Sequence, residues 1–222
     1  MPLRSNVFCI KRKSEKKQSL DFSKAVFIYM LGGLVGTLWE TIWFFHRRGH
    51  LVYSNGSMIT PFNFVYGFGA LVIIYGLKNR EKLWQVFLIG ALGGGAVEYM
   101  LSFLEELVLG TRSWDYSYFA FNINGRTSLL HMVFWGILSS FVIFVVYKPY
   151  NRLLDKIPKH IRKKIAYIMA AYIVIDWIIT VGALIRYTAR HAGRKPLSFL
   201  GKFIDYLFPD HSMRKHFPNM RL

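Results

Sequence analysis

The stretch LWQVFLIGALGGGAVEYMLSFLEELVLG, residues 83–110, decides the fold class of this chain. It contains no Lys or Arg, and Glu98 is its first acid. A helix of roughly 20 apolar residues crosses the ~30 Å of hydrocarbon in a bilayer. Because the stretch exceeds that length, it predicts a membrane-spanning helix.

Four other stretches are almost free of charge, at residues 25–45, 61–77, 127–147 and 165–185. The chain is 53% hydrophobic, yet it has 29 Lys+Arg against 12 Asp+Glu. The charges lie between the apolar stretches, which does not fit the basic surface of a nucleic-acid-binding protein. The sequence therefore predicts an all-α, polytopic integral membrane helix bundle in the lipid bilayer, with about five transmembrane helices. The expected divisions are a basic arm (1–24), a transmembrane domain (25–188) and a basic tail (189–222).

The distribution of Lys and Arg predicts how the chain crosses the membrane. Basic residues concentrate in the arm, in 78–82 and in 148–164, while the alternate connectors hold few. Positive residues stay on the cytoplasmic side, so a cytoplasmic N-terminus in a bacterial inner membrane is expected, with residues 114–126 outside. The tail is also basic, which conflicts with five crossings. Either the basic tail is tolerated outside, or one segment is re-entrant, and 61–77, the shortest stretch, is the candidate. The tail segment PLSFLGKFIDYLF (196–208) predicts a short helix in the membrane interface.

Two of the predicted helices carry the same pattern of small residues and an acid. Helices in a membrane approach closely where small residues recur every four positions, and an acid on that stripe points into the bundle. The pattern could be a chance match, or it could mark a tandem repeat of two helix hairpins, a symmetry that transporters use around a central site. The two sets are Gly32, Gly36 and Glu40, then Gly90, Gly94 and Glu98.

The connector WDYSYFAFNINGR, residues 114–126, is unusually aromatic and polar for an exposed loop. It predicts a structured outer cap in which Trp114, Tyr116 and Tyr118 lie at headgroup depth as an aromatic belt and Asn124-Gly125 turns the chain. Asp115 and Arg126 would fold back over the face of Glu98 and Glu105. Arg126 is expected to balance an acid of that face, with Glu106 pointing elsewhere; a purely structural ion pair is the alternative.

Ionisable groups inside membrane helices are functional candidates, and the cap adds further polar groups. Asp176 is expected to be neutral and bonded to a neighbouring helix, and His131 to fill the bundle. The candidate solute-binding residues are Glu40, Tyr66, Glu98, Glu105, Trp114, Asp115, Asn122, Asn124 and Arg126.

The sequence also predicts what the chain lacks. Cys9 is the only cysteine, and no zinc-binding, phosphate-binding or nucleophile motif is present. No metal, cofactor or nucleic-acid partner is therefore expected, and an enzymatic role is disfavoured without being excluded.

Five segments in order resemble one bacterial membrane family, the CmpB-like type IV ABC transporters. They are the Trp39-Glu40 pair, YGFGALVIIYG (66–76), EYMLSFLEE (98–106), the 114–126 connector and HMVFWG (131–136). The resemblance implies a polytopic inner-membrane protein, a permease-like component whose partner is a separate ATPase or another membrane subunit. Thr127 and Ser128 stand where the family tends to have Ile and Cys.

Together these observations favour a transport protein that binds a small polar or ionic solute at an acidic cluster in the outer leaflet. Two alternatives remain open at this point. One is a membrane-embedded enzyme acting on a lipid-linked or envelope substrate, and the other is a non-catalytic accessory membrane protein.

Overall fold

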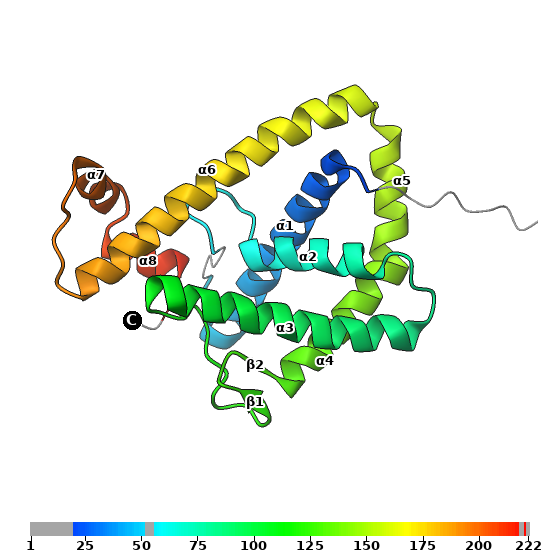
Figure 1. The fold of residues 1–222 in the computed structure, drawn as a ribbon, viewed down its shortest axis with the longest axis horizontal. Coiled ribbons are helices and arrows are strands. Elements are labelled where there is room, and N and C mark those ends of the chain that lie inside the picture. The colour runs from blue at the N-terminus through cyan, green and yellow to red at the C-terminus, as the bar shows by residue number, and fades with distance from the viewer. Residues whose placement is uncertain (1–19, 52–55, 218–219, 221–222) are drawn as a thin grey trace, which may run out of the picture.

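The computed structural model describes residues 20–51, 56–217 and 220. Most of the predicted basic arm lies outside the described residues. The described chain is helical apart from one small antiparallel hairpin (Figure 1). The helices are α1 (Phe22–Arg48), α2 (Phe64–Leu77), α3 (Leu83–Leu109), α4 (Leu129–Phe141), the π-helix η1 (Val142–Tyr147), α5 (Lys148–Lys156), α6 (Lys159–His191), α7 (Phe199–Leu207) and α8 (Asp210–His216); the strands are β1 (Asn122–Ile123) and β2 (Thr127–Ser128).

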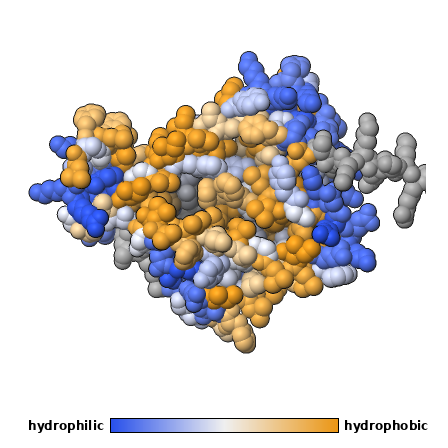
Figure 2. All heavy atoms as spheres, in the orientation of Figure 1, coloured by the Kyte–Doolittle hydropathy of each residue, from blue (hydrophilic) through white to orange (hydrophobic). Residues whose placement is uncertain are grey.

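Four helical segments are long and apolar enough to span a membrane: Phe22–Arg47, Leu83–Leu109, Leu129–Lys156 and Lys159–His191. The third combines α4, η1 and α5. Hydrophobic side chains cover most of the face in Figure 2, and hydrophilic ones gather toward its edges, including the end where α5 lies. The prediction of an all-α membrane helix bundle is confirmed.

The fifth apolar stretch forms only the short helix α2. Its 14 residues give a length of about 21 Å, which is less than the hydrocarbon thickness. The segment before it runs beside the middle of α1: Asn63 N donates to Gly33 O (3.1 Å), and Thr37 Oγ1 donates to Pro61 O (2.8 Å). Helix α2 therefore begins inside the bundle, where irregular backbone is tolerated because the protein itself supplies hydrogen bonds.

Asp176 of α6 holds this irregular segment in place. Its side chain is 1% exposed and accepts from Ser57 Oγ, from Ile59 N (3.0 Å), and from both N (3.2 Å) and Oγ1 (2.6 Å) of Thr60. Thr180 Oγ1, one turn further along α6, donates a fifth bond (3.1 Å). The prediction that Asp176 bonds a neighbouring helix is wrong, because its long-range partners lie on the connector before α2.

The glycine stripe of α1 packs against α2. A side chain at Gly36 would overlap the Tyr66 ring, and one at Gly32 would meet Ala70. The ring of Tyr29 in turn packs directly against Gly67 of α2. These contacts explain why small residues are needed at this crossing.

The stripe of α3 packs against α4 in the same way. A side chain at Gly94 would overlap Trp135, and one at Gly90 would overlap Ser139. Gly136, which follows Trp135 as Gly67 follows Tyr66, receives the ring of Phe87. The two hairpins thus repeat one pattern of contacts, which favours a tandem repeat over a chance match of glycines.

The ends of the bundle are tied by ion pairs. Where α1, α5 and α6 meet, Arg162 contacts Asp21 (2.9 Å) and Asp155 (3.4 Å), and Lys24 contacts Asp155 (2.6 Å). Burial tends to raise the pKa of Asp21, but hydrogen bonds from Ser23 and the Lys24 backbone and the charge of Arg162 outweigh it and lower the pKa to about 2.

The tail folds back onto the last part of α6. Arg186 pairs with Asp205 (2.7 Å), and Arg190 pairs with both Asp205 and Asp210. Met213 of α8 is fully buried. Helix α7 forms where the apolar pattern predicts one; its position in the membrane interface stays a prediction, as does the cytoplasmic N-terminus.

Candidate functional site

The cap is built around a tight hairpin turn. Strand β1 pairs with β2 in antiparallel register, and Arg126 N donates to Ile123 O (3.0 Å) across the turn. Asn124 and Gly125 have φ of 52° and 68°, as the two central residues of a type I′ turn require. The Asn-Gly dipeptide therefore turns the chain as predicted.

Three candidate residues hold the cap together. Asn122 donates to Phe119 O (2.9 Å) and accepts from Gly125 N (3.0 Å), so its amide is used within the loop. Asn124 Nδ2 donates to Tyr99 Oη of α3 (3.0 Å), and Trp114 Nε1 donates to Arg126 O (2.9 Å). These side chains shape the cap through bonds to the protein itself.

Asp115 also serves the local fold. Its Oδ1 accepts from Ser117 N (2.8 Å) and from Ser117 Oγ (2.5 Å). The same oxygen lies against Gly125, where an added side chain would overlap it. Asp115 thus braces the turn from the opposite side of the loop.

Glu98 lies beneath the cap, at the end of the α3 glycine stripe. It is 6% exposed. Tyr116 Oη donates to Oε1 (3.1 Å), and Thr127 Oγ1 donates to Oε2 (2.8 Å). No Lys, Arg or His of the described residues forms an ion pair with this carboxyl group. Glu98 therefore lies in the bundle with hydroxyl donors from Tyr116 and Thr127 and a further hydrogen bond from Trp135 of α4.

Aromatic rings surround the Glu98 carboxyl group. Tyr116 stacks on His131 of α4 with ring centroids 3.7 Å apart, and Tyr66 lies 6.3 Å from Trp135. Burial raises the pKa of Tyr116, and the charges of Glu98 and Glu40 raise it further. Tyr116 is therefore a hydrogen-bond donor at neutral pH, and it lies within electrostatic reach of both stripe glutamates.

The structure thus brings Glu40, Tyr66 and Glu98 of the predicted site together, one from each of the first three helices. The interior residues that sequence reasoning did not select are Tyr116, Thr127 and Trp135. Tyr116 was expected at headgroup depth as part of an aromatic belt. The aromatic HMVFWG segment was a signal for Trp135, and nothing in the sequence singled out Thr127.

The other two acids of α3 have different partners. Glu105 accepts from Ser113 N (3.0 Å) and Ser113 Oγ (2.6 Å). Glu106 pairs with Arg112 (3.0 Å) and with Arg126. The prediction that Arg126 balances an acid of the Glu98–Glu105 face is wrong, since the turn carries Arg126 to Glu106 on the neighbouring face of α3.

Arg126 is the main link between the cap and α3. It is 7% exposed, its Nη1 donates to Ser102 Oγ (3.4 Å), and its guanidinium lies 5.4 Å from the Phe103 ring. The Tyr99 ring lies 5.6 Å from it on the same helix. Aromatic rings stabilise a poorly hydrated cation, so Arg126 anchors the cap through one acid and two rings.

A double-mutant cycle tests whether Glu106 is the acidic partner of Arg126. We expect the thermal destabilisation by Arg126→Ala and Glu106→Ala to be non-additive, because the two charges are in contact. Arg126→Ala and Glu105→Ala should add, since Glu105 bonds Ser113 instead. Thermal midpoints in detergent give both cycles, and coupling to Glu105 in place of Glu106 would contradict this arrangement.

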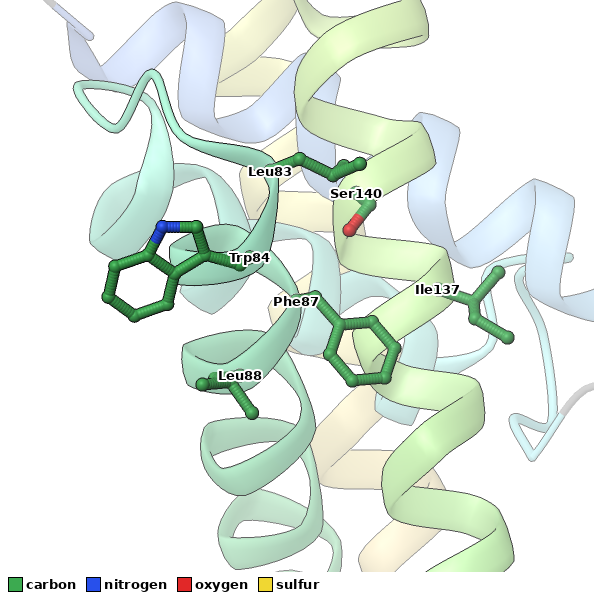
Figure 3. A pocket seen from close by; sticks show the side chains of 6 residues that line it. All are labelled: Leu83, Trp84, Phe87, Leu88, Ile137 and Ser140. Atoms are coloured by element: carbon green, nitrogen blue, oxygen red, sulfur yellow. The ribbon is translucent and has the colours of Figure 1, made fainter.

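A surface groove lies away from this cluster, between α3 and α4 near the start of α3 (Figure 3). Its volume is about 550 Å³. Five of its six lining residues are apolar, and Ser140 is the exception; the others are Leu83, Trp84, Phe87, Leu88 and Ile137. None of the predicted site residues lines it. Within the described part of the chain, no group of three or more His, Cys, Asp or Glu could hold a metal ion.

The fold and the buried cluster define a class: a multi-pass helical membrane protein that contains two similar hairpins, with an acid at the end of each glycine stripe, and a further long apolar helix, α6. A family model described as "Putative ABC-transporter type IV" matches residues 27–181. The chain belongs to this family, which confirms the resemblance found in the sequence. No curated protein and no solved structure matches the chain.

Proposed function

We propose that the protein is the permease-like component of a transport system and that it binds a small cationic solute between its two hairpins. The binding groups are Glu40 and Glu98, with Tyr66 and Tyr116 beside them. A protein in a family described as ABC transporters also needs a source of energy. The chain has no phosphate-binding glycine loop, so the proposal includes a separate ATPase subunit.

The observation that carries the proposal is the environment of Glu98. A buried acid is normally paired, because removing a carboxylate from water is unfavourable without compensation. Here the partners are the hydroxyl groups of Tyr116 and Thr127 and the Trp135 indole, all of them neutral, and no basic side chain of the described residues pairs with it. A cationic solute would supply the missing positive charge.

The rings beside the acid support the choice of an organic cation. Tyr66 and Trp135 lie against the two glycine stripes, and Tyr116 spans from the cap to Glu98. Aromatic faces attract ammonium groups, most strongly where water is excluded. A carboxylate together with such rings favours an alkylammonium group over an anion.

The cap sets the outer boundary of this site. Asn122, Asn124 and Trp114 bond the cap internally or to α3, whereas Tyr116 and Thr127 reach inward to Glu98. Opening the cap would remove both hydroxyl donors from Glu98 at once. The cap therefore has the position of an outer gate in the proposed mechanism.

We expect Glu98→Gln to abolish cation binding while the protein stays folded, because the amide keeps the size of the side chain and removes the charge. Thermal midpoints in detergent would be measured with tetramethylammonium, ethanolamine, sodium, glutamate and phosphate. A solute at about 100 times its Kd stabilises by roughly 2.7 kcal/mol, which is a shift of several degrees. The organic cations should raise the midpoint of the wild type, but not that of Glu98→Gln.

Glu81→Gln is the matched control, since Glu81 is an exposed acid at the turn before α3. It should keep the full response to cations. Stabilisation by anions alone, or equal cation responses in the wild type and Glu98→Gln, would refute the proposed solute class. A solute found in this way can then be followed in proteoliposomes with any ATPase that copurifies.

A further inference from the structure

The rod formed by α4, η1 and α5 changes helical geometry in its middle. Residues Val142–Tyr147 are π-helical, with hydrogen bonds that reach one residue further back than in an α-helix. Pro149 follows two residues later. Proline lacks an N–H and its ring clashes with the carbonyl four residues before it, here that of Val145. The wider turn of η1 is the local response to this proline.

The π-helix determines which face of α5 is buried. Tyr147 is 3% and Asn151 is 2% exposed, and the two lie one turn apart on the same face. Tyr147 Oη and both amide atoms of Asn151 are buried with no hydrogen-bond partner among the described residues. Buried polar groups are nearly always bonded. On the same helix Leu154 is 2% and Leu153 is 54% exposed, so α5 buries an unpaired amide beside one leucine and leaves the other leucine outside.

An α-helical register would reverse this arrangement. Converting η1 to α-helix adds about one residue of rotation, roughly 100°, so each residue of α5 moves to the place of its C-terminal neighbour. Val146, Tyr150 and Leu153 then face inward, and Tyr147, Asn151 and Leu154 leave the interior. Val146 would replace Tyr147 and Tyr150 would replace Asn151, so the unpaired polar atoms would leave the interior, and one leucine would replace the other.

Contacts at the end of the rod hold the present register. Asp155 pairs with Lys24 Nζ (2.6 Å) and with Arg162 Nη1 (3.4 Å). Arg162 Nη1 also donates to Leu154 O (2.8 Å), and Tyr150 Oη donates to Phe27 O (3.0 Å). Asp155 itself is 53% exposed, so this latch is open to solvent and to changes of charge.

We propose that η1 is a two-register switch. In one register Asn151 and Leu154 are buried and Asp155 is latched by Lys24 and Arg162; in the other the rod is α-helical, Asn151 is exposed and Leu153 is buried in place of Leu154. The switch turns the exposed basic side chains of α5, among them Arg152, about the rod axis. It rests on residues remote from the Glu98 cluster and stands independently of the proposed solute.

Cysteine accessibility tests the switch at the residues that exchange places. In a Cys9→Ser background, Asn151→Cys and Leu153→Cys are labelled with a polar maleimide, each with and without Pro149→Ala or Asp155→Asn. Pro149→Ala removes the cause of the π-helix, and Asp155→Asn weakens the latch. Each should raise the labelling rate of Asn151→Cys about tenfold, equivalent to about 1.4 kcal/mol, and lower that of Leu153→Cys.

A locked variant provides the control. Deleting Val145 removes the extra residue of η1, so that α-helical geometry keeps Asn151 facing inward. Asn151→Cys should then stay protected even with Asp155→Asn. Ala166→Cys, at a fully buried position of α6, reports unfolding of the bundle. A joint increase at positions 151 and 153, or no change at either, would overturn the switch.

Discussion

Gly94→Ala is expected to lower the thermal midpoint by several degrees, because its new methyl group would overlap the Trp135 ring across the α3–α4 crossing. Overpacking of a close-packed interior costs about 1–3 kcal/mol, and each kcal/mol corresponds to roughly 2–4 °C in a chain of this size. Thermal unfolding in detergent, followed by intrinsic fluorescence, measures the effect. Trp135 lies at the crossing, so its emission should change as well.

The neighbouring glycine is the matched control. An added side chain at Gly93 would meet nothing within 4 Å, and alanine favours a helix over glycine by about 0.5–1 kcal/mol. Gly93→Ala should therefore be neutral or stabilising. Gly36→Ala should behave like Gly94→Ala, since it would overlap Tyr66 in the first hairpin. Equal midpoints for the variants at 93 and 94 would rule out this packing.

Asp176→Ala is expected to be about as destabilising as breaking a buried ion pair, about 3–5 kcal/mol. The substitution removes the acceptor for five donors, four of them on the segment 57–60. An unsatisfied buried donor costs about 1–3 kcal/mol, although the segment can relax toward other partners. The loss should be largest in the segment before α2, which hydrogen exchange at residues 56–63 can measure.

Two milder variants provide reference values for the loss of stability in Asp176→Ala. Ser57→Ala removes one donor and should cost about 1 kcal/mol, while Asp176→Asn keeps one acceptor oxygen and should lie between the two. If Asp176→Ala were no more harmful than Ser57→Ala, the carboxyl group would not be what holds the start of α2 inside the bundle.

The duplicated contacts connect the packing at the two glycine crossings to the proposed solute site. Glu40 and Glu98 end stripes that pack in the same way, and both acids lie within electrostatic reach of Tyr66. Loosening either crossing would change the distance between the acids. We therefore expect Gly36→Ala and Gly94→Ala to weaken any solute response that depends on Glu98.

The sequence by itself determined the features that depend on local composition and spacing. Uncharged stretches longer than the hydrocarbon thickness predict spanning helices, because backbone polar groups must be bonded within the segment in lipid. Glycines four apart predict a close crossing, and Asn124-Gly125 predicts the turn, because both residues tolerate positive φ. Glu40 and Glu98 were selected on this basis, and the structure brings them together with Tyr66, which lies in a segment that carries the family resemblance.

Only the tertiary structure decided which groups meet across the chain. Glu105 and Glu106 are adjacent in sequence, and helical spacing fixes the angle between them without showing which one a distant turn will reach. The type I′ turn carries Arg126 to Glu106, and the connector before α2 folds inward until Asp176 can bond it. Such pairings depend on loop paths and on which donors each buried carboxyl group can satisfy, and neither is encoded in the periodicity of a single helix.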